Sequence, residues 1–248
     1  MQVVVTAAGL GKRSGLDGRM RKEMLPIYDC KDGNIVLRPF LEVIISRYRN
    51  LGLKDFVLVL SPSDVMTQSY VRDYLDFVTV TFQESAKGFG DAVYCARDYI
   101  SGDFILNCGD GIYCEEAFQK KLIGHRTSGS GHAVLALMGV SNPKRYGVAS
   151  IREKDGRVVV EDVEEKPEKP KSNLAIMAMY RLPEEIFPVL ERSRERKELT
   201  PAIQSLIMKG MDVEAIIGES EKWLSVGIAS EYVSVLQRSL LFLGPCDS

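Results

Sequence analysis

The fold is decided by the stretch Val3-Val4-Val5-Thr6-Ala7-Ala8-Gly9-Leu10-Gly11-Lys12-Arg13. Its first part is a continuous, mostly β-branched run, which is typical of a strand buried on both faces of a parallel sheet. Its second part is a glycine loop, in which backbone N–H groups can approach a phosphate without interference from a Cβ. Together they predict a phosphate-binding turn at the carboxyl end of an α/β sheet.

Strand and helix patterns alternate from this stretch to about residue 126. Strands are predicted at 55–60, 78–82 and 104–107, and helices at 36–50, 64–75 and 90–100. Such alternation predicts a Rossmann-like, doubly wound sheet in which the loops after Ala7, Phe82 and Asn107 converge.

The second half of the chain is richer in strand patterns. Strands are predicted at 133–140, 148–152, 158–163, 174–180 and 213–217, and helices at 184–192, 201–208 and 230–243. No linker or repeat separates the halves. We therefore expect one mixed α/β domain over residues 1–248, with residues 1–126 as its first half and a β-rich lid within residues 127–248.

Composition and charge describe a soluble globular chain. Lys and Arg number 32 against 34 Asp and Glu, so the net charge of −2 argues against a nucleic-acid partner. No apolar run approaches the roughly 20 residues of a membrane span, and the N-terminus lacks the basic segment of a signal peptide. The five cysteines include no C-x-x-C pair, so we expect reduced thiols in a cytoplasmic protein.

The glycine loop favours a polyphosphate ligand. Ser14 stands where a dinucleotide-binding loop has its third glycine, and the Walker pattern is absent. The loop continues through further glycines and carries five cations, which suit several phosphates better than two. These cations are Lys12, Arg13, Arg19, Arg21 and Lys22. The alternative is a solvated, charged loop.

Six ordered blocks carry a resemblance to a known family. They are Ala7-Ala8-Gly9-x-Gly11-x-Arg13, Lys22-Glu23-Met24-Leu25-Pro26, Gln83 to Gly90, Cys108-Gly109-Asp110, Arg145-Tyr146-Gly147-Val148, and Glu164-Glu165-Lys166-Pro167 followed by Pro170-x-Ser172-Asn173-Leu174-Ala175. This pattern resembles the sugar-1-phosphate nucleotidyltransferases, the family of UTP:glucose-1-phosphate uridylyltransferase and glucose-1-phosphate thymidylyltransferase. The resemblance covers most of the chain.

The resemblance implies transfer of a uridylyl or thymidylyl group from an NTP to a sugar 1-phosphate, such as glucose 1-phosphate, with release of pyrophosphate. It implies a nucleotide-binding half (1–126) and a sugar-binding half with the C-terminal helix (127–248). The NTP and the sugar 1-phosphate are the expected partners. The expected cofactor is Mg²⁺.

The same resemblance implies a role for each matched residue. Ala8, Gly9 and Gly11 would cradle the triphosphate, and Gln83 and Gly88 would bind the base. The catalytic residues would be Arg13 on the pyrophosphate, Lys22 on the α-phosphate, Asp110 as metal ligand and Lys166 on the sugar phosphate. Gly147, Glu165, Lys166 and Asn173 would bind the sugar. Each has a structural alternative, such as a strand-end turn for Asp110 and a surface ion pair for Glu165 with Lys166.

Three departures from the family pattern affect the phosphate and metal sites. Lys12 replaces the Thr of G-T-R, and Met20-Arg21 stands where relatives have proline. Gly111 follows Gly-Asp where relatives often have Asp or Asn. Ser225 replaces the Asp of W-x-D-x-G, a second metal ligand. We therefore expect activity with a raised Mg²⁺ requirement.

Other functions stay open at this point. One is a regulatory homologue that binds nucleotide without turnover, and another is a cytidylyltransferase that acts on a phosphorylated alcohol. The third is an NAD-dependent oxidoreductase, in which Asp29 would bind the ribose. The amphipathic C-terminal segment could pack on its own domain or on another subunit, so a homo-oligomer also stays open.

Overall fold

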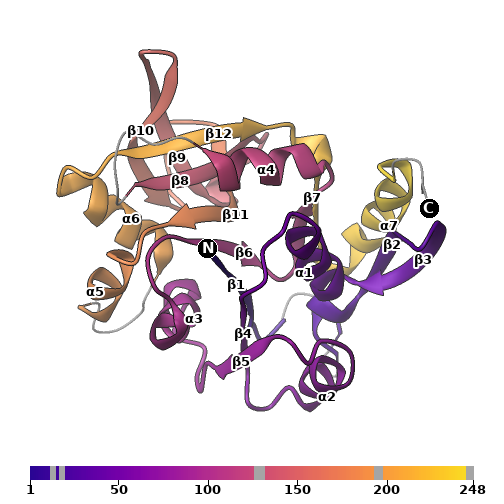
Figure 1. Cartoon of the computed structure of the whole chain (residues 1–248). Coiled ribbons are helices and arrows are strands. Elements are labelled where there is room, and N and C mark those ends of the chain that lie inside the picture. Colours follow the sequence, from indigo (N-terminus) through magenta and orange to yellow (C-terminus); the bar gives the residue numbers. More distant parts are fainter. Residues whose placement is uncertain (12–14, 17–19, 126–131, 193–197, 244–248) are drawn as a thin grey trace.

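A nine-stranded mixed sheet runs through the molecule (Figure 1). The computed structural model describes residues 1–11, 15–16, 20–125, 132–192 and 198–243. The strand order is β5-β4-β1-β6-β11-β8-β12-β10-β9. The strands are β1 (Gln2–Ala7), β4 (Phe56–Leu60), β5 (Thr79–Phe82), β6 (Phe104–Cys108), β8 (Ala133–Gly139), β9 (Gly147–Lys154), β10 (Arg157–Glu165), β11 (Leu174–Leu182) and β12 (Val213–Gly218).

The first four strands of that order are parallel, and β1 lies between β4 and β6. Val5 pairs in register with Leu58 on one side and with Asn107 on the other, and all three side chains are buried. β11 then joins β6 and β8 in antiparallel orientation. Strands of both halves therefore share one sheet, and the predicted mixed, doubly wound α/β fold is confirmed.

Helices cover both faces of the sheet. One face packs against α1 (Phe40–Asn50), α2 (Val65–Tyr74) and α4 (Glu116–Gly124), and α7 (Tyr232–Leu241) extends the same hydrophobic cluster beyond the sheet, where it packs mainly on β2 (Pro26–Lys31). The other packs against α3 (Phe89–Tyr94), α5 (Ile186–Glu191) and α6 (Leu199–Met208). The buried residues separate into one hydrophobic cluster per face, as strands buried on both faces require.

A β-hairpin replaces part of the predicted helix over 36–50. β2 (Pro26–Lys31) and β3 (Asn34–Pro39) pair in antiparallel orientation, and α1 begins only at Phe40. The turn consists of Asp32 and Gly33, both with positive φ, which is the geometry that favours Asp-Gly in two-residue hairpins. Pro39 lacks an N–H donor and so marks the boundary between strand and helix. β2 was also not among the predicted strands.

Three further elements were not predicted. The strands β7 (Gly111–Tyr113) and β13 (Trp223–Ser225) form a second two-stranded sheet, and α4 follows β7. Strands of three residues carry too little periodicity to recognise in sequence. Short 3₁₀ turns complete the fold: η1 (Lys22–Met24), η2 (Arg97–Tyr99), η3 (Pro143–Arg145), η4 (Ser220–Lys222) and η5 (Ala229–Glu231).

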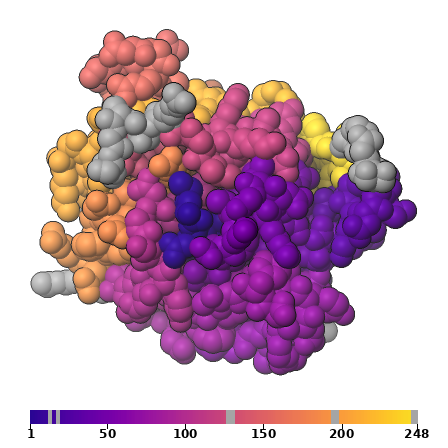
Figure 2. All heavy atoms as spheres, in the orientation of Figure 1, coloured from indigo at the N-terminus to yellow at the C-terminus, as the bar shows by residue number. Residues whose placement is uncertain are grey.

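The β9–β10 hairpin projects from the body of the molecule (Figures 1 and 2). Its turn is Asp155-Gly156, again with positive φ at both residues, between the strands predicted at 148–152 and 158–163. The far end of this hairpin, where Gly147 pairs with Glu165, lies within the sheet. No helix in the described ranges is long and apolar enough to cross a bilayer.

One of the described cysteines is not a reduced thiol. Cys95, Cys108 and Cys114 are free. Cys30, on β2, is disulfide-bonded, so the expectation was wrong for this residue.

Candidate active site

A cavity of about 460 Å³ opens at the carboxyl ends of the parallel strands. The six described residues predicted to bind the triphosphate and base all line it: Ala8, Gly9, Gly11, Lys22, Gln83 and Gly88. The other lining residues are Thr6, Leu10, Glu23, Ala86, Phe89, Ala92, Cys108 and Gly227. The convergence follows from the topology, because the loops after parallel strands meet at one edge of the sheet.

Arg21 holds the glycine loop instead of facing the cavity. Its guanidinium donates to the Gly9 carbonyl at 3.1 Å and to Ser63 Oγ at 3.4 Å, and its Nε lies 3.7 Å from Asp64 Oδ2. The residue is 6% exposed. Arg21 thus positions the loop, whereas the sequence analysis counted it among the cations that would bind phosphate. Arg13, which is predicted to bind the pyrophosphate, lies outside the described residues, as do Lys12 and Arg19.

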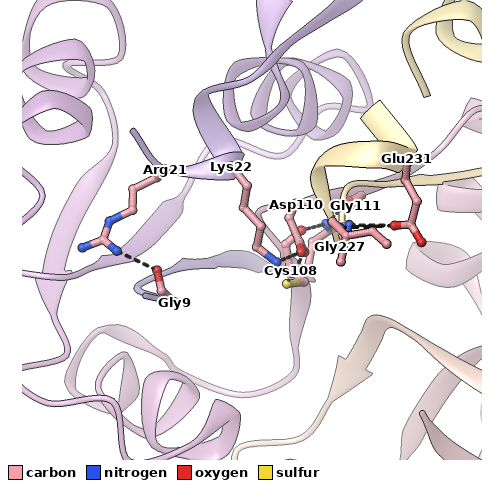
Figure 3. Close-up of polar contacts among 10 residues, drawn as sticks. Gly9, Arg21, Lys22, Cys108, Asp110, Gly111, Gly227 and Glu231 are labelled. Atoms are coloured by element: carbon pink, nitrogen blue, oxygen red, sulfur yellow. Dashed lines mark hydrogen bonds and ion pairs between the residues drawn. The ribbon is translucent and has the colours of Figure 1, made fainter. Parts of the chain in front are cut away.

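Lys22 extends from the same segment in another direction and forms an ion pair with Asp110 (Figure 3). Asp110 also accepts a hydrogen bond from Cys108 Sγ at 2.7 Å. Burial alone would lower the pKa of Lys22, but the charges of Asp110, Cys108 and Glu23 raise it above its ordinary value. Lys22 is therefore a permanent cation beside the end of β6, within reach of the cavity.

Glu23 is a buried carboxylate in the same wall of the cavity. It is 2% exposed, and its Oε2 has no hydrogen-bond partner among the described residues. Burial, and next the charge of Asp110, raise the pKa of Glu23 to about 8. The hydroxyl of Thr6, another lining residue, is likewise buried without a partner in the described part of the chain. Sequence reasoning assigned no role to either side chain.

Gln83 and Gly88 form the opposite wall. Gln83 is 5% exposed, and its Nε2 donates to Gly88 O at 3.1 Å and to Asp91 Oδ2 at 2.9 Å. The amide donor thus orders the segment before α3, and the carbonyl oxygen is the polar atom left for a ligand. Gly88 has a φ of 117°, a conformation that glycine adopts without steric cost, immediately before Phe89.

The predicted sugar-binding residues Gly147, Glu165 and Lys166 come together in a second cluster. Glu165 accepts from Lys166 Nζ at 2.6 Å and from Thr200 Oγ1 at 2.7 Å. A Cβ on Gly147 would lie 2.8 Å from Thr200 Oγ1 and 3.2 Å from Glu165 Oε2, so this position admits only glycine without rearrangement. Lys166 has a φ of 46°, a strained conformation for a lysine. Strain of this kind is typical of functional sites.

Asn173 does not join this cluster. Its side chain is exposed at the start of β11, and its carbonyl accepts from Val140 N at 3.0 Å. Tyr180, on β11, is buried, and burial, followed by the charges of Glu165 and Cys108, raises the pKa of its hydroxyl.

The strand that pairs with the segment after Asp110 brings no carboxylate to it. Ser225 pairs in register with Gly111, and Val226 N donates to Asp110 O at 3.3 Å. Ser225 lines a neighbouring cavity of about 390 Å³ that shares Gly227 with the first. Within the described ranges no three His, Cys, Asp or Glu side chains gather. Such a donor set fits a hard cation that takes most of its ligands from phosphates and water.

Asp29 has no access to a ribose. It is buried on β2 and forms ion pairs with Arg38 and Arg47, the latter at 3.9 Å. This arrangement argues against the oxidoreductase alternative, which needs a carboxylate at the end of a second sheet strand.

A model of the nucleotidyl transferase family matches residues 2–240. The chain belongs to this family. The low-salt glycan biosynthesis nucleotidyltransferase Agl11 of Haloferax volcanii is 27% identical over 88% of this chain, which spans 60% of that protein. The UTP–glucose-1-phosphate uridylyltransferase of Staphylococcus haemolyticus is 29% identical over 83% of this chain and 81% of that protein.

Solved structures of the nucleotidyl transferase type share the fold. A UDP-glucose pyrophosphorylase from Acinetobacter baumannii superposes with a TM-score of 0.73 at 20% identity, over 97% of this chain and 92% of that one. The family is named for an enzymatic reaction, nucleotidyl transfer, and the glycine-loop cavity is the candidate site for it in this chain.

Proposed function

We propose that this nucleotidyl transferase transfers a uridylyl or thymidylyl group from an NTP to a sugar 1-phosphate, such as glucose 1-phosphate. The observation that carries the proposal is that Lys22, ion-paired with Asp110, lines the glycine-loop cavity together with the other described residues expected to bind the NTP. A triphosphate in that cavity would lie within reach of the Lys22 ammonium.

The reaction needs positioning more than acid–base chemistry. An oxygen of the sugar phosphate attacks the α-phosphorus in line, the bond to the β-phosphate oxygen breaks, and pyrophosphate leaves. The attacking phosphate is already ionised near neutral pH, because its second pKa is about 6. No general base is required, which agrees with a site built from cations and backbone N–H groups.

Lys22 would stabilise the charge that develops on the α-phosphoryl group. In the free protein its ammonium pairs with Asp110, so it must exchange this partner for a phosphate oxygen when the NTP binds. Its flexible stem allows that movement. Arg13 is proposed to neutralise the pyrophosphate.

On the acceptor side, Lys166 would bind the sugar phosphate. Glu165, held by Lys166 and Thr200, would accept hydrogen bonds from sugar hydroxyls. The absence of a side chain at Gly147 leaves room for the ring beside this carboxylate. Asn173 is retained as a proposed contact only through the family resemblance.

Asp110 is the proposed ligand of a Mg²⁺ ion. When bound, such an ion would offset negative charge on the triphosphate and on the group being transferred. Ser225 contributes no charge, so Asp110 and the substrate phosphates would carry more of the binding.

The test is a panel of four NTPs against several sugar 1-phosphates, monitored for pyrophosphate with and without Mg²⁺. We expect release with UTP or dTTP and one sugar 1-phosphate. Tight NTP binding without pyrophosphate release would contradict the proposal and favour a regulatory homologue. Turnover with CTP and a phosphorylated alcohol would favour the cytidylyltransferase alternative.

A further inference from the structure

The site lacks one negative charge that the family pattern leads one to expect. Ser225 has a hydroxyl at that position, and its register partner Gly111 has no side chain at all. Asp110 is the only carboxylate that the sequence places at the end of β6, and it is already paired with Lys22. A divalent cation at Asp110 would therefore benefit from a second carboxylate from another element.

Glu23 is a carboxylate near Asp110 that has one oxygen without a hydrogen-bond partner among the described residues. It follows Lys22 directly in η1, lines the same cavity, and its Oε2 is buried without a hydrogen-bond partner among the described residues. A buried carboxylate oxygen left unpaired is unfavourable by a few kcal/mol or more. Such an atom indicates a partner that binds to the protein.

The position of the Glu23 side chain points to the partner. Its Cγ lies 3.1 Å from where a Cβ on Gly109 would stand, so the chain runs against the residue that precedes Asp110. The side chain of Glu23 thus lies beside the loop that carries Asp110, and a divalent cation bound there could take an oxygen from each carboxylate.

We propose that Glu23 supplies the second carboxylate of a divalent-cation site with Asp110, in the role that Ser225 cannot fill. This inference rests on the proposed function for the location of the site. It places the metal next to Lys22, the lysine proposed to bind the phosphate. It also gives the buried, unpaired oxygen of Glu23 a partner.

The direct test is crystallographic. Crystals of the full chain soaked with Mn²⁺ and UTP should show an anomalous peak bound by carboxylate oxygens of both Glu23 and Asp110. A peak bound by Asp110 with Glu23 outside its coordination shell would overturn the inference. So would a Mn²⁺ ion bound only through the phosphates.

A solution test uses Mn²⁺ affinity in the absence of turnover, followed by the electron paramagnetic resonance signal of free Mn²⁺ with UTP present and sugar phosphate omitted. Glu23→Gln should weaken binding by about tenfold or more, because it removes one of two charged ligands at nearly constant shape. Glu221→Gln removes one charge from an exposed position in η4 and should leave the affinity within about twofold. Equal affinities for Glu23→Gln and the wild type would overturn the inference.

One further variant and one comparison of outcomes complete the test. If Glu23→Gln does not fold, Glu23→Asp keeps the charge, shortens the side chain and should still weaken Mn²⁺ binding. Failure of the inference is separable from failure of the proposed function. Wild-type turnover with a Mn²⁺ affinity independent of Glu23 rejects only the inference, whereas Glu23-dependent Mn²⁺ binding without any pyrophosphate release rejects only the function.

Discussion

Gly111 and Ser225 are register partners across the β7–β13 sheet, and the indole ring of Trp223 fills the space beside Gly111. A Cβ on Gly111 would lie 2.3 Å from the Trp223 ring. Positions 111 and 225 thus form one local arrangement, in which the Trp223 ring takes the space that a side chain at position 111 would need. A carboxylate can be introduced at position 225 but not at 111 without moving the ring.

Ser225→Asp should therefore lower the Mg²⁺ requirement. The added carboxylate lies beside Asp110 and supplies a charged ligand, so half-maximal pyrophosphate release should need several-fold less Mg²⁺. The measurement is the initial rate as a function of Mg²⁺ concentration at saturating substrates. Ser225→Asn is the size-matched neutral control and should behave like the wild type. An identical Mg²⁺ dependence for Ser225→Asp and the wild type would show that position 225 does not face the ion.

Arg21→Ala should weaken nucleotide binding without removing a phosphate contact. The guanidinium fixes the Gly9 carbonyl to Ser63, so its loss should loosen the glycine loop. We expect an unfolding free energy lower by about 1–3 kcal/mol and an NTP affinity lower by about tenfold, measured by urea denaturation and calorimetry. Arg72→Ala, whose side chain is 73% exposed on α2, should change stability by less than about 0.5 kcal/mol. Unchanged UTP affinity in Arg21→Ala would refute the positioning role.

Glu23 should make the metal-free protein less stable as the pH rises. Its pKa in the folded protein is about 8, against an ordinary value of 4.5, so the folded state holds the proton over that interval and the unfolded state does not. The contribution of protonated Glu23 to the unfolding free energy is therefore fully present below about pH 4.5, and it is lost as the pH rises to 8.

Glu23→Gln removes this titration. In EDTA, its unfolding free energy relative to the wild type should increase between pH 5 and pH 8.5 by an amount on the order of a few kcal/mol. Denaturation curves at four pH values measure it. A stability difference that stays constant over this interval would mean that Glu23 titrates normally.

Gly147→Ala should impair the sugar phosphate selectively. The methyl group would push Thr200 and Glu165 apart, whereas the nucleotide cavity contains none of these residues. The KM for the sugar 1-phosphate should rise by about tenfold or more, and the Kd for UTP should stay within about twofold. Gly139→Ala is the matched control, because nothing lies within 4 Å of its added Cβ. Parallel losses of both affinities would place Gly147 in a general structural role.

Much of the candidate site was predictable because it follows from strand ends. A buried run followed by Gly9 and Gly11 locates the end of β1, and parallel topology then brings Gln83 and Cys108 to the same edge. The pairing of Gly147 with Glu165 depended on recognising the family blocks, since nothing in the spacing of 18 residues predicts a register.

The remaining features depend on side-chain direction, which a single sequence does not encode. Arg21 and Lys22 are adjacent cations, yet one turns toward Ser63 and the other toward Asp110. Glu23 is polar in sequence and nearly fully buried in the fold, because the chain passes under Gly109. The β2–β3 hairpin is different, since Asp32-Gly33 is a recognisable turn that the apolar spacing through Pro39 obscured.

The hydrogen-bonded pairing of β6 with β11 limits how the enzyme can close on its substrates. β6 leads to Asp110, β11 pairs with β6 and with β9, and β9 begins at Gly147, the register partner of Glu165, so the two candidate clusters are built on one continuous sheet. A hinge between the halves would have to break the backbone ladder from Asn107 to Phe104. Any closure over the substrates must therefore involve loops and side chains that move while the sheet stays rigid. The smallest such movement is that of Lys22, which would exchange the Asp110 carboxylate for a phosphate.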